Sequence, residues 1–187
     1  MGTSCEEIFD DQNSNGWNDP NDNEGPEHDI PGTIEDFQVS LDYSSLNPGS
    51  LGAFDADSKK VVANNNQAAD LVLCWQNNYG YVITQPKSSL LSQLYEANNK
   101  SYNNTNTCTI QNLGQQNLSY YADKNTLYEM SVKSGSIPNL QGTNIVQVEP
   151  GDIIAFKTNK GTKGVAQISS LSKVTKKITL KGYVYYQ

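Results

Sequence analysis

The most constraining feature of this chain is a pair of β-branched and aromatic runs separated by a short polar turn. The first run covers residues 153–158, the second covers 164–169, and the turn between them holds a Lys-Gly pair at 160–161. Runs of this length and composition are typical of strands, and the Lys-Gly pair supplies the positive φ angle that a tight hairpin needs. The C-terminal part of the chain is therefore predicted to form antiparallel sheet.

Strand-like patterns recur along the rest of the chain. The final run places Ile178, Leu180, Val184 and Tyr186 on one face, which predicts a half-buried strand. Further strands are predicted at five segments: 36–41, 51–55, 69–75, 80–84 and 145–148. We expect an all-β fold, or a β-rich fold with one or two short helices, built as an antiparallel sandwich or a barrel-like sheet.

Two short helices are predicted among these strands. Residues 88–97 carry four apolar side chains at spacings that place them on one side of a helix. A second helix is predicted from Asp123, a suitable N-cap residue, to about residue 133. The segment between them, 98–106, is rich in asparagine and predicts a loop.

Charge divides the chain into two parts. Residues 1–36 contain eleven acids and no Lys, and the remaining residues contain nine acids and all thirteen Lys. Residues 1–32 hold too few apolar groups to offset the entropy of ordering, which predicts a disordered acidic spacer before a single domain at 33–187. Because the lysines are dispersed and the chain contains no Arg, the pattern argues against nucleic-acid binding.

The start of the chain predicts a site of attachment. Cys5 follows two small residues, Thr3 and Ser4, and precedes a run of acids. This order resembles the start of a mature bacterial lipoprotein, which implies a membrane anchor through a lipid on Cys5 and a place on the outer membrane at the cell surface. No apolar signal region precedes Cys5, so we expect that a signal peptide has been removed. An ordinary free thiol is the alternative.

Two further cysteines lie in the predicted domain. If Cys5 is acylated, Cys74 and Cys108 remain as a possible disulfide pair in an oxidising compartment. Such a bridge closes a loop of about 35 residues and contributes roughly 3–4 kcal/mol in the chain-entropy account. The alternative is two buried, reduced thiols, and the apolar run around Cys74 suits either state.

The side chains that most hydrolytic enzymes need are scarce. The only histidine is His28, inside the acidic spacer. A Ser-His-Asp or Cys-His arrangement, or a zinc site with several His or Cys ligands, therefore cannot form in the domain. A pair of carboxylates would suffice for glycoside hydrolysis, but most domain acids stand beside turn residues, where solvated acids are usual. We expect a binding protein and not an enzyme.

One string in the spacer has the spacing of a calcium loop. Oxygen-bearing side chains occupy positions 1, 3, 5, 9 and 12 of it, and a glycine occupies position 6. The five are Asp11, Asn13, Asn15, Asp19 and Asp22. The last position holds Asp where an EF-hand has a bidentate Glu, and no helices flank the loop. An acidic, Asn-rich spacer also produces such strings by composition alone.

Residues 151–168 resemble a motif of the HmuY-like surface lipoproteins of Bacteroidetes. The shared pattern is a strand that ends in Thr, a Gly turn and a second strand that begins near a Lys. The final strand and the segments 52–62 and 69–73 are similar to other elements of that family, although Ala69 stands where the family usually has Trp. The resemblance implies an all-β surface lipoprotein that captures haem between paired His or Met axial ligands.

The chain departs from that family at the haem ligands. The domain has no His, and Met130 is the only Met after Met1, so neither a bis-His nor a bis-Met site can form. Met130 with a Tyr or a water is one remaining way to ligate iron, and a place in the core is the alternative. The domain is rich in flat side chains that suit sugars or planar ligands, although aromatics also pack on sheets. They include Trp75, Tyr79, Tyr81, Tyr120 and Tyr121. We therefore predict a non-catalytic domain whose ligand is haem or a related planar molecule, or else a glycan or a protein partner of an outer-membrane uptake system.

Overall fold

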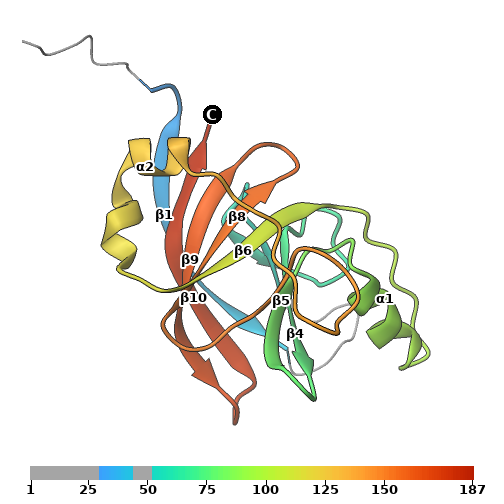
Figure 1. Cartoon of the computed structure of the whole chain (residues 1–187). Coiled ribbons are helices and arrows are strands. Elements are labelled where there is room, and N and C mark those ends of the chain that lie inside the picture. Colours follow the sequence, from blue (N-terminus) through green and yellow to red (C-terminus); the bar gives the residue numbers. More distant parts are fainter. Residues whose placement is uncertain (1–29, 44–51) are drawn as a thin grey trace, which may run out of the picture.

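The computed structural model describes residues 30–43 and 52–187, which form ten strands and three short helices. The strands make two antiparallel five-stranded sheets, so the predicted β-rich antiparallel fold is confirmed (Figure 1). In spatial order, sheet A consists of β1 (Thr33–Asp42), β10 (Lys177–Tyr186), β9 (Lys163–Ser172), β8 (Asp152–Thr158) and β6 (Cys108–Gln115). Sheet B consists of β3 (Lys60–Val62), β2 (Ala53–Asp55), β4 (Leu71–Gln76), β5 (Gly80–Thr84) and β7 (Ile145–Gln147).

The core lies between the two sheets. Phe37 of β1 stacks on Phe54 of β2 with ring centroids 4.7 Å apart, and Phe156 of β8 meets Phe54 edge-on at 6.4 Å. Phe54 is fully buried. Because these rings come from both sheets, they join them across the centre of the fold.

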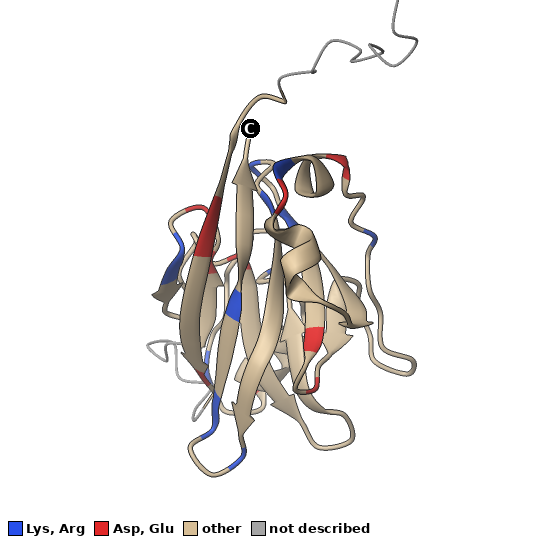
Figure 2. Cartoon of the chain, turned by 90° about the vertical axis from the view of Figure 1, so that its left-hand side faces the viewer, with Lys and Arg blue, Asp and Glu red and all other residues tan. Residues whose placement is uncertain are grey.

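Helices cover the outer faces of the sheets. The helix α1 (Ser89–Glu96) is capped by Ser88 and packs Leu90 and Leu91 against the outer side of sheet B. The 3-10 helix η1 (Leu118–Ala122) and α2 (Lys124–Glu129) lie over the outer face of sheet A (Figures 1 and 2). They bury Tyr121 and Leu127 against it. Asp123 caps α2 as predicted, but the helix ends at Glu129 and not near residue 133, because Met130 turns to an extended ψ of 124°. Among the described residues, no helix is long and apolar enough to cross a membrane.

The edges of the two sheets meet on both sides, which makes the sandwich barrel-like. At one side, an ion pair joins Lys59, after β2, to Glu35 of β1. At the other side, Asn112 Nδ2 of β6 donates to the Gln147 carbonyl of β7 at 2.8 Å. Side-chain contacts thus join the edge strands of the two sheets where no backbone pairing does. Edge strands covered in this way are protected from pairing with other chains.

Candidate functional site

An aromatic cleft of about 450 Å³ lies at one end of the domain. Its walls come from the β4–β5 hairpin, the segment after β7 and the end of β9, so both sheets contribute. The lining residues are Trp75, Tyr79, Gly80, Tyr81, Gln147, Val148, Glu149, Pro150, Leu171 and Lys173. The volume lies within the range of small-molecule sites in proteins.

Local strand pairing explains the aromatic wall. Trp75 and Tyr81 face each other across the β4–β5 hairpin, with ring centroids 5.0 Å apart and an interplanar angle of 83°. Gly80 begins β5 with a φ of +74°, a backbone conformation that favours glycine. Tyr43, at the end of β1, stacks on Trp75 and meets Tyr81 edge-on. Three rings from two sheets therefore hold one another in position.

Hydrogen bonds fix the tyrosines of the aromatic cleft. The Tyr81 hydroxyl donates to the Ser172 carbonyl at 3.2 Å, which ties sheet B to the end of β9. Burial raises the pKa of the Tyr81 hydroxyl, and the neighbouring Tyr43 hydroxyl raises it further, so this group stays a neutral donor. Tyr79 donates to the Pro138 carbonyl at 2.8 Å. The wall is preformed, which lowers the entropy cost of binding.

Polar side chains surround this aromatic wall. Gln147 and Glu149 are exposed on one side, and Lys173 is exposed on the hairpin that follows β9. Flat apolar rings with hydroxyl-binding groups at their border are what a sugar needs, because its faces are apolar and its edges are polar.

The residues that the sequence predicted as ligand contacts lie together in a different cavity, away from the aromatic cleft. Tyr120, Tyr121 and Met130 line a second cavity of about 310 Å³, between η1 and α2. We call it the η1–α2 cavity. Met130 is half-buried and packs against the core under this cap, as the core alternative predicts. Asp123 and Glu129 also line the cavity, so the two carboxylates of a haem would meet like charges there.

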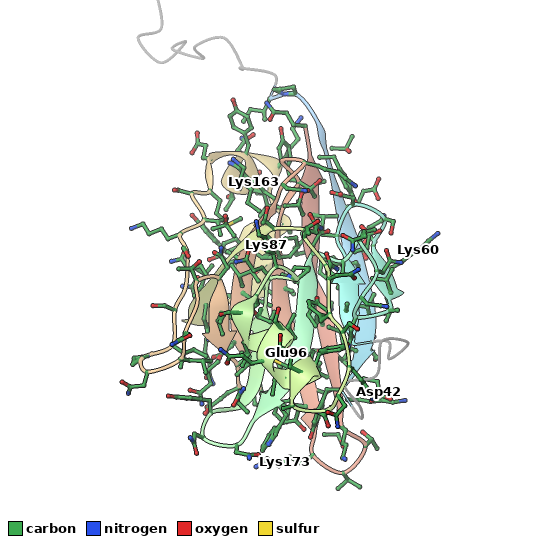
Figure 3. All side chains as sticks on the ribbon, turned by 90° about the vertical axis from the view of Figure 1, so that its right-hand side faces the viewer. Asp42, Lys60, Lys87, Glu96, Lys163 and Lys173 are labelled. Carbon is green, nitrogen blue, oxygen red and sulfur yellow. The ribbon has the colours of Figure 1, made fainter. Side chains whose placement is uncertain are left out.

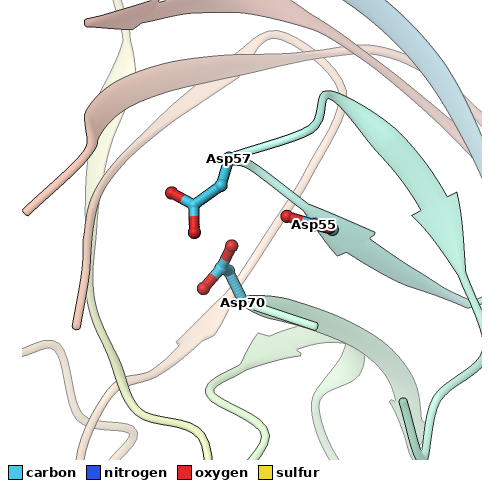
Figure 4. Close-up of side chains that lie close together, drawn as sticks. All are labelled: Asp55, Asp57 and Asp70. Carbon is cyan, nitrogen blue, oxygen red and sulfur yellow. The ribbon is translucent and has the colours of Figure 1, made fainter. Parts of the chain in front are cut away.

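Three aspartates form a cluster that the sequence did not reveal (Figure 4). Carboxylate oxygens of Asp55, Asp57 and Asp70 all lie within 4.8 Å of one another. Asp55 ends β2, Asp57 lies in the following turn, and Asp70 directly precedes β4. The expectation of solvated acids was wrong for two of them, since Asp55 is 8% exposed and Asp70 1%. Strand pairing places Asp70 beside this turn, and sequence patterns carry no sign of it.

Groups of the chain itself engage all six carboxylate oxygens of the cluster. Asp57 accepts from Thr162 Oγ1 at 2.6 Å and pairs with Lys160 Nζ at 2.7 Å, which joins it to the β8–β9 turn. Further hydrogen bonds link Asp70 to Ala56 N and Asn106 Nδ2, and Asp55 to Ser58 N and Oγ. The cluster therefore connects a turn of sheet B to a turn of sheet A.

Burial sets the protonation of this cluster. It raises the pKa of Asp70 to about 7, against the opposing effect of the Ala56 N–H, and the charges of Asp57 and Asp55 raise it further. A carboxyl that keeps its proton near neutral pH carries no charge, so the cluster holds less negative charge at that pH. Carboxylates are also the ligands of divalent cations, but here each oxygen already has a partner in the chain. We interpret the cluster as a structural link between the sheets.

The predicted disulfide between Cys74 and Cys108 is not formed. Both residues are buried free thiols. Cys108 points into the core between the sheets, with Leu73 of β4, whereas Cys74 packs under α1 on the opposite face of sheet B. Neighbouring residues of a strand face opposite sides, so the β4 backbone separates the two thiols. The alternative of two buried, reduced thiols describes the structure.

The remaining predicted sites lie outside the described residues. They are the lipidation residue Cys5 and the calcium-like set Asp11, Asn13, Asn15, Asp19 and Asp22. Lipid attachment and calcium binding at these residues therefore stay predictions. Comparisons with protein-family models, with curated proteins and with solved structures found no match for this chain. The resemblance to HmuY-like proteins likewise stays a prediction.

Proposed function

We propose that this protein is a non-catalytic binding domain and that its aromatic cleft takes a carbohydrate. The observation that carries the proposal is the joint wall of Trp75 and Tyr81, which is held in position by the Tyr43 ring and by the hydrogen bond from Tyr81 to Ser172 of sheet A. Lys173 and Glu149 at the border supply a donor and an acceptor for sugar hydroxyls. The haem alternative has less support, since the only domain Met lies in the η1–α2 cavity among acids.

Tryptophan fluorescence can test carbohydrate binding directly. The chain has two tryptophans, Trp17 and Trp75, so a Trp17→Phe background leaves Trp75 as the single reporter inside the cleft. We expect a saturable change in its emission with at least one oligosaccharide from a panel of hexose, N-acetylhexosamine and uronic-acid oligomers. By isothermal titration calorimetry, Trp75→Ala is expected to weaken binding at least about tenfold, because it removes the half-exposed aromatic face of the wall.

Lys173 offers a matched pair of variants for the same assay. Lys173→Ala removes a lining side chain, whereas Lys176→Ala removes an exposed lysine of the same hairpin that does not line the cleft. We expect only the first to reduce affinity. If no oligosaccharide changes Trp75 emission, or if Trp75→Ala folds normally and binds as the parent does, the carbohydrate proposal is wrong.

We further propose that a lipid on Cys5 holds the domain at the cell surface. The support is the Thr3-Ser4-Cys5 sequence and the acidic run that follows it. When the full chain is expressed in a bacterium behind a lipoprotein signal peptide, intact-mass spectrometry is expected to show acyl chains on Cys5. A Cys5→Ser variant should leave the membrane fraction. An unmodified Cys5 thiol in membrane-processed protein would contradict the anchor.

A further inference from the structure

The η1–α2 cavity differs in chemistry from the aromatic cleft. Its walls combine two phenol rings, a thioether and two carboxylates, and no Lys or His of the described residues lines it. The residues are Tyr120, Tyr121, Asp123, Thr126, Glu129 and Met130, with Asn125 at the border. Aromatic and sulfur groups favour an apolar or polarisable ligand surface, and the carboxylates favour positive charge.

The two rings meet edge to face, and the outer ring, Tyr120, is open to solvent. Their centroids lie 5.1 Å apart with an interplanar angle of 83°, so each ring makes a wall nearly at right angles to the other. Tyr120 is 66% exposed, whereas Tyr121 is 6% exposed. An exposed tyrosine ring that packs on little of the core keeps a face available for a ligand, and aromatic faces attract cations through their quadrupole.

The carboxylates keep this corner negative. Asp123 Oδ2 accepts hydrogen bonds from Thr126 N at 2.8 Å and from Thr126 Oγ1 at 2.9 Å. These bonds lower the pKa of Asp123, so it is ionised at neutral pH. Glu129 is exposed and has no hydrogen bond or ion pair with any described residue.

Two lysines beside this cap, Lys163 and Lys124, contact other groups of the chain. Lys163 Nζ donates to the Tyr128 carbonyl and lies 5.8 Å from the centroid of the Tyr128 ring. Lys124 Nζ donates to the Ile30 carbonyl. The Lys163–Tyr128 contact also shows a cation over a phenol ring on the same cap, which is the interaction that the η1–α2 cavity offers to a ligand.

The walls of the cavity are held in place before any ligand arrives. Tyr121 is buried in the cluster under the cap and its hydroxyl donates to Gln116 Oε1. Leu127 of α2 is fully buried in the same cluster. Tyr120 and Glu129 are exposed and can adjust to a ligand, whereas the buried walls lose little entropy on binding.

We propose that the η1–α2 cavity binds a small organic cation of the methylated-ammonium class. The rings and the Met130 thioether contact the methyl groups, and Asp123 and Glu129 neutralise the charge. The proposal does not depend on carbohydrate binding. Lys163 beside α2 and Lys173 at the aromatic cleft lie at opposite ends of the domain, so the two sites can be tested separately (Figure 3).

Methionine methyl NMR gives a direct probe of this site. The chain contains two Met, so a ¹³C-methyl methionine spectrum has two signals, and Met130→Leu identifies that of Met130. We expect choline chloride and tetramethylammonium chloride to shift the Met130 signal saturably in the millimolar range. Dimethylbutanol, the uncharged isostere of choline, and sodium chloride at equal ionic strength are expected to leave it unchanged.

Matched variants separate charge from ring contacts. Tyr120→Ala is expected to weaken binding roughly threefold to fivefold and Tyr120→Phe to preserve it, because the ring face carries the attraction. Glu129→Gln is expected to weaken binding by about the same factor. Glu96→Gln is the control, since Glu96 is also the exposed last residue of a short helix but lies on α1.

Each outcome decides for or against the cation site. If phosphatidylcholine vesicles shift the Met130 signal, the cation site is supported and its ligand is a lipid headgroup. If choline shifts the signal and the vesicles do not, the site is supported and its ligand is a soluble cation. Equal shifts with choline and dimethylbutanol would overturn the proposal, because charge would then play no part. Equal weakening by Glu129→Gln and Glu96→Gln, or no saturable shift with either ammonium salt, would overturn it as well.

Discussion

Replacing Asp70 with Asn is expected to raise the free energy of unfolding at about pH 8 by roughly 2–4 kcal/mol. Asp70 is buried beside Asp55 and Asp57, and burial raises its pKa from 3.8 to about 7. Above that pH the wild-type protein must bury a third charged carboxylate in the cluster. The side-chain amide of the Asp70→Asn variant can still accept from Ala56 N through its oxygen. Its NH₂ group then replaces the oxygen that accepts from Asn106 Nδ2, so the expected gain is smaller than the full cost of ionising Asp70.

The sign of the pH dependence follows from the direction of this shift. Between pH 3.8 and about 7 the folded protein binds more protons at Asp70 than the unfolded chain does. The stability contributed by the protonated group is therefore present at low pH and is lost as the pH rises through the folded pKa. One pKa unit corresponds to about 1.4 kcal/mol, so the loss across this window is on the order of 4 kcal/mol.

Urea denaturation at a series of pH values between about 4 and 8 measures this effect. We expect Asp70→Asn to show a flatter curve than the wild type and to gain most at the highest pH. Asp36→Asn is the control, because Asp36 is exposed on the edge strand β1, outside the cluster. Parallel curves for wild type and Asp70→Asn would contradict the proposed protonation of the cluster.

Replacing Gly182 with Ala is expected to destabilise the domain by roughly 3–5 kcal/mol. A Cβ atom at Gly182 would lie 1.8 Å from the Val165 carbonyl oxygen and 3.0 Å from the Ala166 Cα. Both are backbone atoms of the paired strand β9, so no side-chain rotation relieves the clash. The two strands must separate or change register, and either change disturbs the centre of sheet A.

Thermal unfolding measures this cost, with Gly114→Ala as the control. Gly114 has a φ of +72°, but a Cβ added there meets no atom within 4 Å. We expect the control to lose about 1 kcal/mol from backbone strain alone. Gly182→Ala should lower the melting temperature by roughly 10 °C, several times more than the control. Similar losses in both variants would show that β9 and β10 do not approach so closely.

Most of the strands could be predicted because their signals are local. The runs at 153–158 and 178–186 became β8 and β10, and Ile178, Leu180 and Val184 share the core-facing side as predicted. The helix at 88–97 was confirmed as α1, capped by Ser88. Side-chain periodicity within one segment encodes these elements, and it needs no knowledge of the partner strand.

Two strands lacked such signals. β6 contains Asn112 and Gly114 and is bulged between Asn112 and Gln115, so polar residues and a register shift obscure its alternation. β3 is only three residues long and half-buried. Both lie at sheet edges, where pairing on one side and side-chain bonds to the opposite sheet hold the strand in place.

The two candidate binding sites also differ in how far the sequence could predict them. The sequence picked out Tyr120, Tyr121 and Met130 as candidate contacts, and the structure brings them to one cavity, because all three lie close together in the chain. It also named Trp75, Tyr79 and Tyr81 as aromatics suited to sugars. It did not reveal that Leu171 and Lys173, which are far away in sequence, line the same cleft. Sequence left the state of Cys74 and Cys108 open, since their separation depends on which faces of sheet B they occupy.

The sequence by itself determined that this chain forms antiparallel sheet with short helical covers, because strand and helix periodicities are properties of single segments. It also determined that the domain has no histidine for catalysis or haem ligation. Only the tertiary structure decided that Asp70 joins Asp55 and Asp57, and that rings and polar groups from both sheets form a cleft. Those contacts depend on strand order and register, which are set by the packing of the whole core and not by any local pattern.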